Sequence, residues 1–166
     1  MENRGQMQLS FGMIFSIILI VLFIAFAVYA IMKFLSIGET VEIAKFKDEL
    51  QSDIDKMWKG SKGVNEESYF LPSKIKMVCF LDSETPGKGQ NKEMYDELKW
   101  AHYETENLMF YPLDSVEGGL RSMEIKHIDI AKTTEKENPL CFENTKGKLA
   151  LTVSKNYGEA LVTIAR

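Results

Sequence analysis

The sequence has little histidine or cysteine, two residue types from which many catalytic and metal sites are built. Its 166 residues include two histidines and two cysteines, and neither cysteine lies in a C-x-x-C pair. Two thiols alone cannot form a tetrahedral zinc site. The sequence also has no G-x-S-x-G, H-E-x-x-H or phosphate-loop pattern. We therefore expect no catalytic residue, no metal site and no cofactor, and a protein that is not an enzyme.

An excess of basic residues is also absent. The chain has 20 Lys and Arg against 24 Asp and Glu, which gives a formal net charge of −4. Residues 1–37 contain only Glu2, Arg4 and Lys33, so residues 38–166 carry 18 basic and 23 acidic side chains. A nucleic-acid-binding domain needs a clustered basic face that releases counterions. The charge balance therefore argues against nucleic acid as a partner.

Charge is missing altogether from Leu9 to Met32. A helix rises about 1.5 Å per residue and needs roughly 20 apolar residues to cross a hydrocarbon core of roughly 30 Å. We predict a transmembrane helix over residues 9–35, with Lys33 at one membrane edge. A secretory signal would have a shorter apolar core and a small-residue cleavage site after it. We therefore expect this helix to stay with the mature protein.

A second helical pattern follows over residues 36–62. Five apolar residues recur at spacings of three and four and form one stripe: Ile43, Phe46, Leu50, Ile54 and Met57. Ser36 and Glu39 have the spacing of a capping box, so either a new helix begins there or the first helix runs straight on. In both cases the stripe needs an apolar surface to cover it.

Residues 63–166 have the pattern of a small β-rich domain. Six segments have the alternation or the composition of strands, and they are Lys74–Asp82, Leu108–Tyr111, Met123–Ile130, Leu140–Glu143, Lys148–Ser154 and Ala160–Ala165. Turn-like residues join the last three, which predicts an antiparallel meander with the Cys79 strand beside it. The stripe packed on this sheet gives an α+β fold, in which the transmembrane helix continues or restarts as an amphipathic helix on a small antiparallel sheet.

Two shorter features complete the expected domain. Asn91 is a reasonable N-cap for a helix that ends near Glu104. The alternation in the 123–130 segment slips at Lys126 and His127, which indicates a β-bulge.

The two cysteines, Cys79 and Cys141, leave two alternatives open. A disulfide between them would close a loop of roughly 60 residues and contribute about 4 kcal/mol in the chain-entropy model. Such a bond requires that the domain faces an oxidising compartment. Two buried, unbridged thiols on strands are the other alternative.

The N-terminal tail, residues 1–8, is short and polar and carries Arg4-Gly5-Gln6 ahead of the apolar run. Together with the expected architecture, this resembles archaeal type IV pilin-like proteins with class III signal peptides. The resemblance implies that a membrane peptidase cuts between Gly5 and Gln6 and leaves the hydrophobic helix on the mature protein. Many type IV pilins have glutamate at the fifth mature position, where this chain has Ser10.

Signals for the orientation of the membrane helix conflict. The lysines that follow the helix favour a cytoplasmic C-terminus, whereas the short leader, the disulfide alternative and the resemblance favour the outside. We expect a single-pass membrane protein with an extracytoplasmic C-terminal domain, acting as a pilin-like subunit or a minor component of a surface assembly. The alternative is an unprocessed, membrane-tethered accessory or binding domain. Expected partners are membrane lipid, further copies of the chain, and other membrane or surface proteins.

The remaining candidate residues have ordinary structural explanations. His102 and His127 are expected on the surface or at the bulge rather than as metal ligands. Two aromatic segments, Tyr69-Phe70 and Met109-Phe110-Tyr111, could contact a partner, but their strand spacing favours the core.

Overall fold

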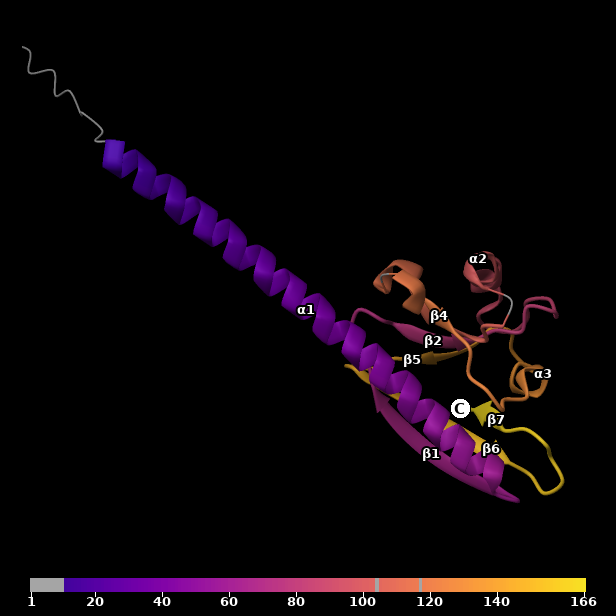
Figure 1. Ribbon diagram of the computed structural model, residues 1–166. Helices are drawn as coiled ribbons and strands as arrows, with labels where there is room; N and C mark the ends of the chain where they lie inside the picture. Colours follow the sequence, from indigo (N-terminus) through magenta and orange to yellow (C-terminus); the bar gives the residue numbers. More distant parts are fainter. Residues whose placement is uncertain (1–10, 104, 117) are drawn as a thin grey trace, which may run out of the picture. The chain divides into compact units, whose positions relative to one another are not determined.

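The computed structural model describes residues 11–103, 105–116 and 118–166. The chain divides into two compact units, with the boundary between Thr40 and Val41. Helix α1 (Phe11–Lys59) is continuous from the first unit into the second (Figure 1). Of the two alternatives at Ser36, the structure therefore has one uninterrupted helix rather than a second helix.

The second unit contains the predicted apolar stripe of α1. The buried residues of α1 are the five that the spacing predicts, Ile43, Phe46, Leu50, Ile54 and Met57. Lys155 stabilises the end of this helix, because its Nζ donates to the carbonyl oxygens of Trp58 at 2.5 Å and Gly60 at 3.0 Å. A cation at a helix C-terminus interacts favourably with the helix dipole and with carbonyls that have no partner inside the helix.

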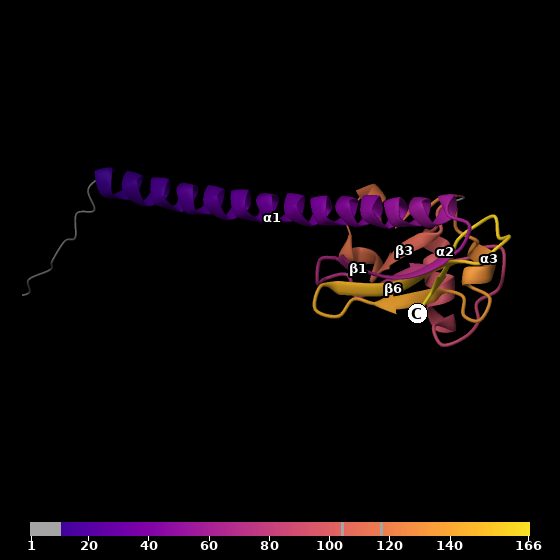
Figure 2. The ribbon, with the colours of Figure 1, turned by 90° about the horizontal axis from the view of Figure 1, so that it is seen from below.

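In the described part of the chain, seven strands form two antiparallel sheets beside this part of the helix (Figures 1 and 2). The first sheet has the order β1-β6-β7, with β1 at Gly63–Phe70, β6 at Lys148–Lys155 and β7 at Thr163–Ala165. The second has the order β4-β3-β2-β5, with β4 at Ser122–Met123, β3 at Leu108–Tyr111, β2 at Met77–Phe80 and β5 at Leu140–Glu143. The α+β fold class predicted from the sequence is confirmed.

The predicted C-terminal meander is confirmed only in part: β6 and β7 are antiparallel neighbours and β5 lies beside the Cys79 strand β2, but β5 and β6 belong to different sheets. β5 pairs with β2 in the second sheet, and β6 pairs with β1 and β7 in the first. The turn at residues 144–147 therefore carries the chain from one sheet to the other, although its composition is that of a hairpin. Strand β1, which has no counterpart among the predicted strands, takes the place beside β6.

Two shorter predictions also need correction. The helix after Asn91 is a 3-10 turn, η1 (Lys92–Met94), followed by α2 (Tyr95–Ala101), and the Asn91 side chain makes no capping hydrogen bond. Of the segment 123–130, only Met123 belongs to a strand, β4 (Ser122–Met123), and Ile128 forms an isolated bridge with Val162. His127 there has a φ of 67°, a left-handed conformation that ends the extended run rather than adding a bulge to a strand. The remaining short elements are η2 (Leu113–Ser115), η3 (Gly118–Leu120) and α3 (Ile130–Thr133).

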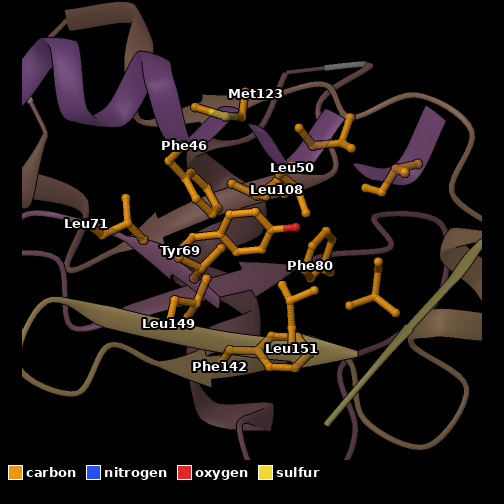
Figure 3. Close-up of a cluster of buried hydrophobic side chains, with 14 of the residues drawn as sticks. Phe46, Leu50, Tyr69, Leu71, Phe80, Leu108, Met123, Phe142, Leu149 and Leu151 are labelled. Carbon is orange, nitrogen blue, oxygen red and sulfur yellow. The ribbon is translucent and has the colours of Figure 1, made fainter. Parts of the chain in front are cut away.

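The main core lies between the α1 stripe and both sheets (Figure 3). Phe46 is fully buried and meets Tyr69 edge to face, with ring centroids 5.4 Å apart. A smaller second cluster surrounds Cys79 and Cys141 and includes Leu81, Tyr95, Leu98 and Met109. Tyr69, Met109 and Phe110 are thus core residues, whereas Phe70 is 65% exposed.

Candidate membrane anchor

The part of α1 in the first unit has no charged residue from Phe11 to Met32, and its side chains are exposed there. Large apolar side chains such as Phe23, Phe26 and Phe34 are 69–78% exposed. A soluble helix that is apolar all round is normally buried. Among the described residues, α1 is the one helix whose length and composition suffice to cross a membrane.

The described serine and threonine hydroxyl groups of the first unit find acceptors within the helix itself. Ser16 Oγ donates to the carbonyl oxygen of Gly12 at 2.8 Å, and Thr40 Oγ1 donates to that of Ser36 at 3.0 Å. An unsatisfied polar group costs several kcal/mol in lipid, and internal bonding of this kind removes that cost. The Ser16 side chain is therefore compatible with a hydrocarbon environment.

The leader residues proposed from the sequence, Gly5 and Gln6, lie outside the described residues, as does Ser10. The expected cleavage between Gly5 and Gln6 stays a prediction.

A disulfide joins Cys79 on β2 to Cys141 on β5, with an S–S distance of 2.09 Å. The two residues lie directly opposite each other in the sheet, and their Cα atoms are 4.0 Å apart. The described part of the chain contains no free cysteine. Disulfides persist in oxidising compartments and are rare in the cytosol, so this pairing is weak evidence for an extracytoplasmic domain.

His127 belongs to a polar cluster on α1 that sequence analysis did not identify. Its imidazole stacks on the indole of Trp58, with centroids 3.8 Å apart and an interplanar angle of 3°. Its Nδ1 lies 2.9 Å from Oδ1 of Asp55. Gln51 Nε2 donates to the same carboxylate at 2.8 Å, while Gln51 Oε1 accepts from the Lys126 amide at 2.8 Å. The cluster fixes the 126–127 loop to the helix.

The hydrogen bond from His127 is the largest of the effects that hold the pKa of Asp55 below its usual value, and the bond from Gln51 acts in the same direction. Desolvation opposes both. His102 is the C-cap of α2, a different place in the fold. Among the described residues, no group of three or more His, Cys, Asp or Glu is placed to hold a metal ion.

A second polar contact links α1 to the first sheet. The Tyr69 hydroxyl donates to Asp53 Oδ2 at 3.1 Å, and Asp53 also forms an ion pair with Lys56 at 2.8 Å. Burial raises the pKa of Tyr69, and the neighbouring Asp53 carboxylate adds to the effect. The Tyr69 hydroxyl thus stays a hydrogen-bond donor, with a role in packing β1 against α1.

Comparison of the chain with protein families, with curated proteins and with solved structures finds no match.

Proposed function

We propose that this protein is a single-pass, membrane-anchored structural subunit, pilin-like in architecture, that carries residues 41–166 outside the cytoplasm as part of a surface assembly. The role is one of anchoring and interaction rather than catalysis. Its partners are membrane lipid and, in the assembly, the apolar helices of neighbouring copies.

One observation carries the proposal: from Phe11 to Met32, α1 is uncharged and has exposed apolar side chains. Lipid or other apolar helices are the environments that such a surface tolerates. The long N-terminal apolar helix followed by antiparallel sheets is consistent with a pilin-like architecture. The Cys79–Cys141 disulfide supports an extracytoplasmic domain.

The intact mass of the protein from its native membrane tests this function. A class III leader predicts a mature chain that lacks Met1 to Gly5 and begins at Gln6. Reduction of the extracted protein is expected to add the mass of two hydrogens. Recovery of an intact leader in the membrane fraction would favour the tethered accessory domain instead, and recovery of the chain in the soluble fraction would exclude both roles.

A pair of glycine variants sharpens the test. Gly5→Val is expected to block cleavage and assembly, because the leader peptidase reads the residue before the cut. Gly38→Val is the matched control, since a Cβ on Gly38 meets no atom within 4 Å. The control is expected to be cleaved normally.

A further inference from the structure

The edges of the two sheets differ in how the chain covers them. The last strand, β7, is covered by the segment before and within α3. The Ile164 amide donates to Thr133 Oγ1 at 3.2 Å, and the Val162 amide donates to the His127 carbonyl oxygen at 2.9 Å. On β5, Arg166 Nη2 donates to the Cys141 carbonyl oxygen at 3.2 Å. The edge strand β4 is only two residues long.

The fourth edge, β1, is eight residues long and pairs with β6 alone. A hydrogen bond just beyond the strand shows which backbone groups of β1 face β6 and which face away from it. In this bond the Leu71 amide donates to the carbonyl oxygen of Gly147, the residue directly opposite. Pairing alternates along antiparallel strands, so the odd-numbered residues of β1 bond to β6. The backbone groups of Val64, Glu66, Ser68 and Phe70 therefore point outward. Among the described residues, no hydrogen bond reaches them.

Open edges of this length attract other strands, and proteins normally cover or shorten them. β1 is both long and apolar at its two ends, where Val64 is 68% and Phe70 65% exposed. β1 lies at the rim of its sheet (Figure 1). An exposed edge with backbone groups and apolar side chains available is the receptor in strand-addition binding.

A groove of about 840 Å³ lies beside this edge, between α1 and the end of β1. Its β1 wall is Ser68, Tyr69 and Phe70, and its α1 wall extends from Val41 to Lys56. The side chains of an added strand alternate between the two faces of the sheet. Those on the α1 side would enter this groove.

The charge around the groove and edge is predominantly acidic. The groove is lined by Lys45, Asp48, Glu49, Asp53 and Lys56, and β1 adds Glu66 and Glu67. Both lysines are engaged in ion pairs, Lys45 with Glu49 and Lys56 with Asp53. Lys148 is also at this edge, with its Nζ 5.4 Å from the Phe70 ring centroid, and the charge of Glu67 acts on Lys56. With Asp48, Glu66 and Glu67 included, the carboxylates at the groove and edge still outnumber the lysines.

We propose that the outer edge of β1 binds an extended segment of a partner protein that carries lysine or arginine, as an additional strand of the β1-β6-β7 sheet. Backbone hydrogen bonds to Val64, Glu66, Ser68 and Phe70 supply the affinity. Basic side chains opposite the acidic rim select the segment. This inference stands on residues 41–166 and does not depend on the proposed membrane role.

The test uses the full chain in an uncharged detergent and two eight-residue peptides, one alternating lysine with valine and one alternating glutamate with valine. Amide exchange is measured at single residues. The lysine peptide is expected to slow exchange at Glu66, Ser68 and Phe70 by about tenfold or more, through newly formed strand hydrogen bonds. The amides that already bond to β6 are expected to change little. The glutamate peptide is expected to have no effect.

Two pairs of variants report on the edge separately. Ser68→Pro removes an outward backbone donor and is expected to weaken binding of the lysine peptide about tenfold. Ser68→Ala keeps the donor, and this variant is expected to bind the peptide as the wild type does. Glu66→Lys is expected to weaken binding of the lysine peptide about two- to fivefold. Glu93→Lys, the same change on η1, is expected to leave this binding unchanged. Because Glu66→Lys leaves the backbone intact, it tests the site even if Ser68→Pro does not fold.

Three results would overturn the proposal. One is unchanged exchange at the outward amides with the lysine peptide. Another is equal binding of the two peptides, which would remove the basis for a basic partner. The third is concentration-dependent protection of β1 without any peptide, which would show that a second copy of the chain occupies the edge.

Discussion

The two parts of α1 share one backbone conformation but have opposite surroundings. From Phe11 to Met32 the side chains are apolar and exposed, whereas between Val41 and Lys59 one stripe is buried and charged residues occupy the other faces. The arrangement of apolar residues around the helix, rather than helix propensity, accounts for the difference. An apolar surface on every side requires lipid or other helices, while a stripe requires one covering layer, which the two sheets provide.

The largest expected effect distinguishes two phenylalanines of the same helix. Phe46 is fully buried in the core and Phe26 is 69% exposed. Phe46→Ala is expected to lower the free energy of unfolding of the domain by about 3–5 kcal/mol, because it leaves a cavity. Phe26→Ala is expected to change it by less than about 0.5 kcal/mol. Urea unfolding in detergent, followed by near-ultraviolet circular dichroism, measures both, and equal losses would contradict the division of the helix.

The next effect concerns the second sheet, which the disulfide between β2 and β5 is expected to stabilise. The bond joins residues 62 positions apart, and its removal is expected to cost about 2–4 kcal/mol. The double variant Cys79→Ala/Cys141→Ala tests this by thermal unfolding. Wild type in excess reducing agent should lose similar stability, and the variant should be insensitive to that agent. A double variant as stable as the wild type under non-reducing conditions would contradict this contribution.

A smaller effect is expected where the packed part of α1 ends. Lys155 is only 9% exposed, and its ammonium satisfies the carbonyl oxygens of Trp58 and Gly60. Lys155→Met keeps most of the volume but leaves these acceptors without the donor, and is expected to cost about 1–3 kcal/mol. Lys62→Met, at an exposed position close to the same helix end, is the control and should be neutral. Equal midpoints for the two variants in urea would rule out the capping role.

The smallest expected effect is on the stability of the domain at low pH. Because the pKa of Asp55 is lowered in the folded protein, its stabilising contribution is complete above the unfolded value of about 4 and is lost as the pH falls through the lower folded value. Asp55 is partly exposed, so solvent screening limits this contribution to about 0.2–1 kcal/mol. Asp55→Asn should destabilise the domain at pH 7, and the difference from wild type should shrink at pH values well below 4. Asp114→Asn, at an exposed site on η2, should give no such convergence.

The sequence was most informative where periodicity and burial coincide. The stripe from Ile43 to Met57 was predicted residue by residue, because a helix with one buried face records that face in its spacing. The strands Leu108–Tyr111 and Leu140–Glu143 were also predicted with their observed bounds. Both are short, apolar and almost fully buried.

Strand β1 and the sheet order could not be predicted in the same way. β1 contains Asn65, Glu66, Glu67 and Ser68, and such polar residues seldom indicate a strand. They are tolerated here because an edge strand with one exposed face needs few apolar residues. Turn composition at residues 144–147 indicates a reversal but does not specify which strand becomes the neighbour. The pairing of β5 with β2 is a contact between distant parts of the sequence, and the local pattern of residues does not indicate it.

The Trp58–His127 stack also gives the protein an optical reporter. The chain has two tryptophans, and Trp100 is already 91% exposed in the folded protein. Trp58 is 36% exposed and lies against the imidazole at the last turn of α1. The change in tryptophan emission on unfolding must therefore come mainly from Trp58. A Trp100→Phe variant would have a single emitter, placed where the packed helix, the His127 loop and the start of the sheet come together.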